Sequence, residues 1–217
     1  IYSMSPPSSG GIHVIQILNI LEGDSLKNIG IHQPESVHLT SAAMQAAFAD
    51  RAKYLGDSDF VKVPIAGLVS KKYAKEIRSK IKNKVALKKS NRSAGNPFPY
   101  ESDETTHFTI MDSQGNTVTS TQTINGWFGS SLVAPGTGIV LNNEMDDFAT
   151  KVGASNLFGA IGGDKNLVEP GKRPLSSMSP TIVFDKGEPL LALGTPSGTR
   201  ILTCVAQTIL NYLEYEL

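Results

Sequence analysis

The feature that most constrains the fold is a change of periodicity near residue 105. Before it, apolar residues recur at the three- and four-residue spacing of helices. After it, residues 107–111 and 117–123 have the alternation of β-strands, and the five residues between them, DSQGN, are typical of a hairpin turn. A hairpin here brings Thr123 beside Thr105. The sequence therefore predicts an α+β protein.

Further elements are predicted on both sides of this point. Helices are expected at residues 12–21, at 35–55, from an N-cap at Ser70 to about residue 81, and at 201–212. Short strands are expected at 139–141, 181–184 and 190–193. Residues 24–34 are interpreted as a polar connector, and the Gly-rich residues 151–174 as a lid or binding loop.

Composition narrows the class of protein. The chain has 217 residues, of which 40% are hydrophobic and 18% charged, as in globular domains. Lys plus Arg and Asp plus Glu both total 20, and this balance argues against nucleic acid as the main partner. Cys204 is the single cysteine, so no internal disulfide is possible. No apolar run approaches the roughly 20 residues of a membrane span.

A basic stretch precedes the hairpin. Residues 71–92 carry ten of the twenty Lys and Arg and one acid, Glu76. We interpret them as a solvated helix face and loop, although an anionic partner is conceivable. Residues 90–104 predict an exposed flexible segment, in which a chain break costs least.

A break between Glu104 and Thr105 would change the chemistry of Thr105. As a new N-terminus, Thr105 would carry a hydroxyl nucleophile and an α-amine that can act as its base. That amine has an unperturbed pKa of about 8, so part of it is neutral at pH 7. Taken alone, Thr105 and Thr106 are more often two β-branched residues opening a strand.

Three further pairs of residues can bind or stabilise charged groups. Glu144 and Asp147 follow a predicted strand and fit an acid/base pair, a cation site, an ammonium cradle or plain turn caps. Transition metals are not expected, because no histidines cluster with them; calcium remains open.

The other two pairs are hydroxyl- and amide-rich. Ser176 and Ser177 precede a strand and fit either a carboxylate site or Ser/Thr turns. Ser197 and Gly198 lie where a strand leads into a helix, whose first amides lack internal partners. That geometry suits an oxyanion hole, but also a phosphate site, a cap or a tight turn.

Four segments together closely resemble gamma-glutamyltranspeptidases. They are residues 2–11 (YSMSPPSSGG), 105–107 (TTH), 141–148 (LNNEMDDF) and 173–180 (RPLSSMSP). The resemblance implies an N-terminal-nucleophile hydrolase with a four-layer αββα sandwich, incomplete in this chain. Residues 1–104 would be the end of the large subunit and residues 105–217 the start of the small subunit.

The resemblance also implies residue roles. Self-cleavage at Glu104–Thr105 would make Thr105 the nucleophile, oriented by Thr123. Asn125, Glu144 and Asp147 would hold the α-amino end of a γ-glutamyl group, and Ser176 and Ser177 its α-carboxylate. The amides of Ser197 and Gly198 would form the oxyanion hole.

The implied substrates are glutathione and other γ-glutamyl compounds, with water, amino acids or peptides as acceptors. The rest of the large and small subunits would be partners. No cofactor and no metal are expected, and a periplasmic or secreted location follows from the family alone.

The chain departs from the family pattern at three points. Ser197 stands where the family usually has Gly, which is tolerable unless the φ angle must be positive. Phe158 lies near the position of a lid-loop Tyr in some bacterial members. The family's carboxylate-binding Arg belongs to a region before Ile1, so the chain is interpreted as a fragment.

Two rival functions remain. One is a related acylase that acts on a glutaryl side chain, against which Glu144 and Asp147 argue, because a glutaryl group has no ammonium. The other is a non-catalytic homologue that serves as a binding module.

Overall fold

The computed structural model describes residues 1–82, 85 and 105–217. The predicted exposed segment 90–104, including Glu104, and part of the basic stretch lie outside the described residues.

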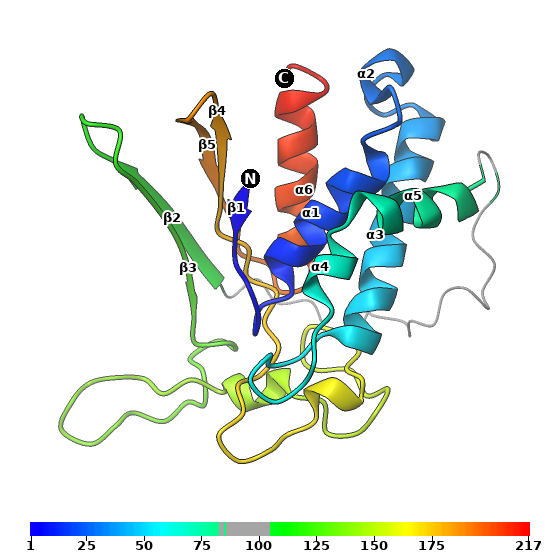
Figure 1. Ribbon diagram of the computed structural model, residues 1–217. Coiled ribbons are helices and arrows are strands. Elements are labelled where there is room, and N and C mark those ends of the chain that lie inside the picture. Colours follow the sequence, from blue (N-terminus) through cyan, green and yellow to red (C-terminus); the bar gives the residue numbers. More distant parts are fainter. Residues whose placement is uncertain (83–84, 86–104) are drawn as a thin grey trace.

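Two small sheets and a layer of helices lie side by side (Figure 1). The hairpin of β2 (Thr105–Met111) and β3 (Thr117–Thr123) forms one sheet. The second sheet has the antiparallel order β1 (Tyr2–Ser3), β4 (Thr181–Asp185) and β5 (Glu188–Leu193). The hairpin contacts β5, where the Thr119 hydroxyl donates to the Leu193 carbonyl at 3.4 Å. The prediction of an α+β protein is confirmed.

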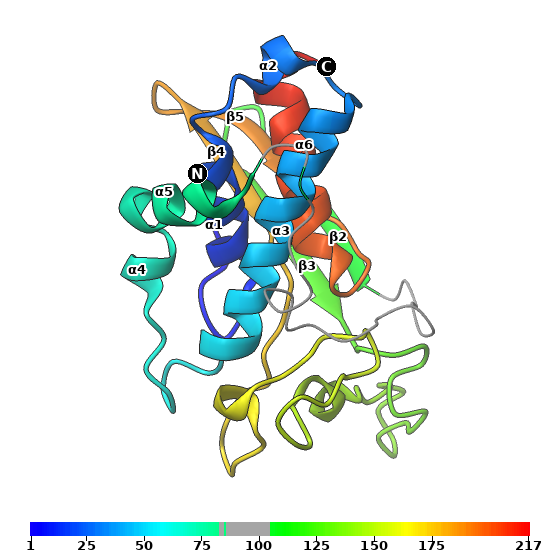
Figure 2. The same ribbon diagram turned by 90° about the vertical axis from the view of Figure 1, so that its right-hand side faces the viewer.

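The helices lie on the other side of the three-stranded sheet (Figures 1 and 2). The four longest are α1 (Gly10–Leu21), α3 (Pro34–Tyr54), α5 (Lys71–Lys80) and α6 (Arg200–Leu213). Short helices α2 (Leu26–Ile29) and α4 (Ile65–Leu68) join them. None of the helices in the described residues is long and apolar enough to cross a membrane.

One hydrophobic core joins residues from before and after position 104. Ile17 and Ile20 of α1 pack with Leu202 and Ile209 of α6, and Val183 of β4 reaches the same cluster. In α3, Ala42, Ala43 and Ala47 are buried, and their small side chains allow close helix packing. The site loops between β3 and β4 extend from one end of this core (Figure 1).

Most predicted elements are confirmed within one or two residues. The four predicted helices correspond to α1, α3, α5 and α6, and the Ser70 hydroxyl caps α5 by accepting the Tyr73 amide at 3.2 Å. Cα pairing of Thr105 with Thr123 confirms the hairpin register. The long loop 151–174 contains only one turn of 3-10 helix, η3 (Asp164–Asn166).

The predicted buried strand at 139–141 is wrong. Only Val140 pairs, in an isolated bridge to Val133, while Ile139 and Leu141 are 60% and 43% exposed. Three apolar residues give too little pattern to separate a strand from an extended loop. The connector 24–34 contains α2, and the sequence did not predict β1 or α4.

An ion pair between buried Asp57 and half-exposed Arg173 fastens the segment before Ser176 to the turn that follows α3. Arg173 donates through Nε and Nη2 to the two carboxylate oxygens of Asp57 at 2.9 and 2.6 Å, and its amide adds a third bond at 2.9 Å. Asp57 is fully buried, whereas the Arg173 side chain is 50% exposed. These bonds hold the pKa of Asp57 well below its usual range.

We expect Arg173→Ala to lower the thermal midpoint by roughly 5–10 °C, because it leaves a buried carboxylate without its cation. Lys80→Ala is the matched control, since it removes a cation from the exposed Lys80–Glu76 pair at 2.7 Å. Its midpoint should fall by about 1 °C or less. Equal losses in calorimetric scans of the two variants would contradict a dominant role for the Arg173–Asp57 pair.

Candidate active site

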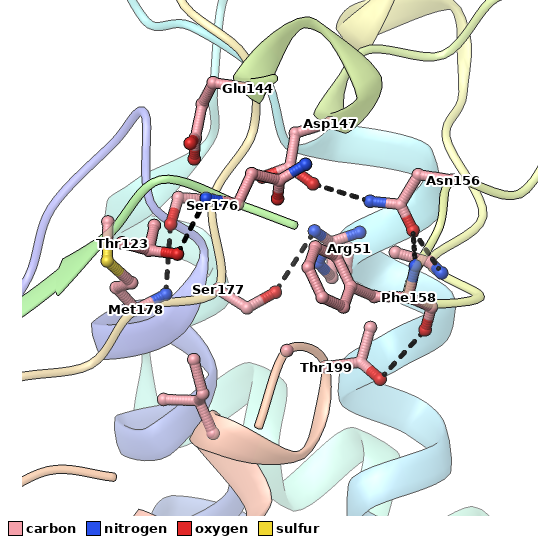
Figure 3. Close-up of a pocket in the computed structure, with 14 residues that line it drawn as sticks. Arg51, Thr123, Glu144, Asp147, Asn156, Phe158, Ser176, Ser177, Met178 and Thr199 are labelled. Atoms are coloured by element: carbon pink, nitrogen blue, oxygen red, sulfur yellow. Dashed lines mark hydrogen bonds between the residues drawn. The ribbon is translucent and has the colours of Figure 1, made fainter. Parts of the chain in front are cut away.

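A pocket at the end of the two sheets gathers most of the predicted site residues (Figure 3). Its empty volume is about 350 Å³, part of which is open to solvent. Seven lining residues were predicted from the sequence: Thr123, Asn125, Glu144, Asp147, Ser176, Ser177 and Gly198. Arg51 and Asn156 also line it and were not predicted. Segments about 150 residues apart thus meet in one site.

The hairpin supplies one wall. Thr105 pairs with Thr123 at the end of the two strands, so the predicted nucleophile and its predicted orienting residue are neighbours in the sheet. The Thr123 hydroxyl accepts the Asn125 amide at 2.9 Å. Asn125 is buried with φ +72°, and its side chain donates to the Asn143 carbonyl at 3.2 Å. This tight turn fixes the distance between β3 and the acidic turn.

The acidic turn is a 3-10 helix, η2 (Glu144–Asp147), tied to the long loop. Asn156 donates from Nδ2 to Asp147 Oδ1 at 2.7 Å (Figure 3). Asp146 Oδ2 accepts the Leu157 amide at 2.7 Å, and Asn166 Nδ2 donates to the Asp147 carbonyl at 2.7 Å. The predicted lid therefore also positions Asp147.

The environment of the pocket disfavours the ionised forms of its two carboxyl groups, Glu144 and Asp147. Burial, with the charge of Glu144, raises the pKa of Asp147 to about 7, and Arg51 opposes the rise. Burial also raises the pKa of Glu144. A cationic ligand between them would favour both ionised forms, so the geometry suits an ammonium group.

The serine segment, residues 175–179, is held by hydrogen bonds to residues 7–9, which precede α1. Ser9 donates its amide to the Ser176 carbonyl at 2.9 Å, and Ser176 donates its own to the Pro7 carbonyl at 3.1 Å. Gly10 permits this approach, because a Cβ there would lie 2.5 Å from the Met178 carbonyl oxygen. The Ser176 hydroxyl accepts the Met178 amide at 3.1 Å, so the Ser/Thr turn is present alongside a place in the pocket wall.

Arg51 anchors the same segment from behind. It is 3% exposed, and its Nη2 donates to the Ser177 hydroxyl at 3.3 Å. The sequence did hold a signal for it: Ser36, Leu39, Ala43, Ala47 and Arg51 recur at helical spacing, so Arg51 falls on the buried face of α3. A charged residue in that row is unusual and demands polar partners.

The two residues predicted to form an oxyanion hole, Ser197 and Gly198, lie just before α6. Among the described residues, the amides of Ser197 and Gly198 donate no hydrogen bond, although their carbonyls accept the amides of Arg200 and Ile201. Gly198 lines the pocket with φ +50°, and a Cβ there would meet the Phe158 ring at 2.6 Å. Phe158, at the expected lid position, therefore packs directly on Gly198.

Ser197 itself is strained. Its φ of +108° lies in a region of backbone conformation that is unfavourable for every residue except glycine. The condition under which Ser would be tolerable at this position is thus not met. Ser197 precedes Gly198 but is not among the residues that line the pocket.

No group of three or more His, Cys, Asp or Glu suited to hold a metal ion occurs in the described part of the chain.

A family model described as Gamma-glutamyltranspeptidase matches residues 1–217. The chain belongs to the gamma-glutamyltranspeptidase family. The resemblance found in the sequence is thereby confirmed over the whole chain, and the pocket geometry can be compared with the roles that the family implies.

Two relatives within the family give the scale of similarity. The chain is 49% identical over 217 residues to a glutathione hydrolase proenzyme of Escherichia coli K12, covering 100% of this chain and 37% of that protein. It is 40% identical over 212 residues to the acylase ACY 1 proenzyme of Pseudomonas sp. SE83, covering 98% and 36%. The chain thus spans little more than a third of these relatives.

A solved structure supports the fold. The cephalosporin acylase of Bacillus halodurans superposes with a TM-score of 0.73, covering 99% of this chain and 36% of that one. The sequences are 23% identical, so the likeness concerns the fold alone.

We expect Asp147→Asn to stabilise the folded protein in a pH-dependent way. Asp147 has a pKa of about 7 when folded and near 4 when unfolded, so its burial destabilises the native state progressively between those values. The gain over wild type should be near zero at pH 4 and on the order of 4 kcal/mol at pH 8. Denaturant titrations at both pH values measure it, and an equal gain at both would contradict the assigned pKa.

We expect Ser197→Gly to raise the free energy of unfolding by about 0.5–1 kcal/mol, because Gly adopts a positive φ without strain. Ser58→Gly is the control: Ser58 is exposed in a turn, and its φ is not positive. It should destabilise slightly through the added chain entropy of the unfolded state. A loss of stability in both variants would show that Ser197 is unstrained.

Proposed function

We propose that the protein from which this chain comes is a self-cleaving γ-glutamyltransferase and glutathione hydrolase. The observation that carries the proposal is the convergence of the seven predicted residues on one pocket at the end of the β2–β3 hairpin. They come from four separate segments of a chain that belongs to the gamma-glutamyltranspeptidase family.

The proposed turnover is a two-step acyl transfer. The Thr105 hydroxyl attacks the γ-carbonyl carbon, and its α-amine takes the hydroxyl proton and passes it to the departing amine. This forms a γ-glutamyl ester on Thr105 and releases, from glutathione, the cysteinylglycine portion. Water or an amino-acid amine then attacks the ester carbonyl, and Thr105 recovers its proton.

The proposed pocket roles follow from charge. Glu144 and Asp147, with Asn125, bind the α-ammonium end, and Ser176 and Ser177 contribute to binding the α-carboxylate. The amides of Ser197 and Gly198 stabilise the oxyanion, and one such donor typically contributes about 10²–10³ in rate. Thr123 orients Thr105, beside which it lies in the sheet.

Self-cleavage uses the same hydroxyl. Thr105 attacks the Glu104 carbonyl carbon, the peptide C–N bond breaks, and an ester forms at the hydroxyl. The hydroxyl proton passes to the nitrogen as the C–N bond breaks, which frees the Thr105 amine, and hydrolysis of the ester then releases the Glu104 carboxylate and restores the Thr105 hydroxyl. Before the cut the Thr105 nitrogen is an amide, which cannot act as a base, so the precursor is inactive in transfer.

The remainder of the protein completes this proposal. Residues 1–104 end a large subunit, residues 105–217 begin a small one, and the missing parts complete an αββα sandwich of four layers. Export to the periplasm or medium accords with the family. No cofactor is required by this chemistry.

A second candidate function is that of an acylase, which would hydrolyse a glutaryl side chain that has no α-ammonium group. The 40% identity to an acylase proenzyme allows this function. The raised pKa values of Asp147 and Glu144 argue against it, because an acyl group without a cation leaves both carboxyls uncompensated.

The deciding experiment is the intact mass of the full-length protein beside a Thr105→Ala variant. We expect two fragments that meet at Glu104/Thr105 in the parent and one uncut chain in the variant, because the variant lacks the hydroxyl. Hydrolysis of a γ-glutamyl anilide, with a glutaryl anilide as control, then separates the two candidates. A folded parent that stays uncut would favour the binding-module hypothesis instead.

A further inference from the structure

Arg51 belongs to α3, more than fifty residues before the proposed cut, yet its side chain ends behind the pocket (Figure 3). We infer that Arg51 is a positioning residue of this site, which sets the Ser177 hydroxyl and supplies the positive charge that keeps Asp147 able to bind an α-ammonium group. The inference rests on the proposed function and names a residue that the sequence did not reveal.

All the hydrogen bonds of Arg51 go to the two segments that meet at the pocket wall, residues 8–9 and 175–177. Nε donates to the Ser9 hydroxyl at 3.0 Å, and Nη2 donates to the Ser177 hydroxyl at 3.3 Å and to the Leu175 carbonyl at 3.4 Å. The Ser9 hydroxyl in turn donates to the Ser176 carbonyl at 2.9 Å. One guanidinium therefore fixes the backbone on both sides of Ser176 and the side chain of Ser177.

Burial distinguishes this role from direct ligand binding. Arg51 is 3% exposed, and its Nε and Nη2 are occupied by protein acceptors. A ligand carboxylate would have to displace those acceptors to bind Nε and Nη2. The guanidinium is thus placed to act through Ser177 and through space.

The positive charge of Arg51 interacts favourably with the carboxylate of Asp147. Burial lowers the pKa of Arg51 to about 10, and Asp147 is the group that opposes this shift, so Arg51 stays charged at neutral pH. Asp147 is not among the ion-paired carboxylates of the described residues, so the attraction acts across a longer distance. In the low dielectric of a pocket wall such an attraction remains substantial.

In the described part of the chain, the other charged groups that act on Asp147 are both acids. Glu144 and Asp146 of η2 disfavour its ionised form, and Asn156 of the long loop contributes a neutral hydrogen bond. Arg51 is therefore the cation that offsets them. Without it, Asp147 would be protonated over more of the neutral range, and the affinity for an ammonium group would fall.

The test compares the competitive inhibition constants of L-glutamate and glutarate across pH 5–9 in the full-length protein. The two ligands differ by the α-ammonium alone, so the ratio of their constants isolates its binding. Titration of the Thr105 amine affects both ligands and cancels in this ratio. We expect wild type to prefer L-glutamate above a midpoint near pH 7 and to lose that preference below it, because Asp147 then binds a proton.

Two variants divide the roles of Arg51. Arg51→Gln keeps a hydrogen-bonding amide but no charge, and its midpoint should move up by about one pH unit. At pH 7 that shift lowers the preference for L-glutamate roughly fivefold. Arg51→Lys keeps the charge but loses the planar fork, so its midpoint should stay near wild type while both ligands bind more weakly.

The outcomes separate the possible failures. A wild type without activity on γ-glutamyl anilide overturns the proposed function itself. An active wild type whose midpoint is unchanged in Arg51→Gln overturns the role of Arg51, because a purely structural residue would lower the yield of active enzyme without moving the midpoint. If Arg51→Gln does not fold, a midpoint in Arg51→Lys that moves up by a full unit overturns it as well.

Discussion

The site depends on one close contact between two serine-rich segments more than 160 residues apart. The Ser176 carbonyl accepts the Ser9 amide and the Ser176 amide donates to the Pro7 carbonyl, which makes a short parallel bridge between Ser8 and Ser176. Gly10 leaves room for this approach. This contact places the N-terminal end of α1 against the wall of the pocket. The hydrophobic core behind it, shared by α1, α3 and α6, makes the contact rigid, because close-packed interiors do not deform continuously.

Groups with unfavourable local energies collect at the pocket. Asp147 is a half-buried carboxyl beside another acid, Arg51 is a cation that is 3% exposed, and Ser197 has a backbone conformation suited to glycine. Each is costly by itself, and each is held by the surrounding structure. Sites that bind charged ligands commonly carry such groups, since a ligand can relieve what the free protein cannot.

The sequence predicted the longer helices and the hairpin well, because their periodicity is local. Seven residues that line the pocket were predicted as site residues through the resemblance to gamma-glutamyltranspeptidases, because the local patterns around Glu144 and Ser176 also fit ordinary turns. The sequence did not predict β1, whose two residues exist as a strand only through pairing with Thr181 and Ile182. Nor did it reveal Arg51 or Asn156, whose importance comes from tertiary neighbours. The apolar triplet 139–141 misled because its pairing is limited to one isolated bridge, from Val140 to Val133.

The Arg173–Asp57 pair and the shared core both join residues on either side of position 104. In an uncut chain these contacts are intramolecular and benefit from a high effective concentration. Once the chain is divided, the same contacts hold together two molecules, and unfolding becomes a dissociation. The folding equilibrium then acquires a dependence on protein concentration that the precursor lacks. A chain cut at Glu104–Thr105, as we propose, would therefore be a complex whose two parts fold together while they are still joined.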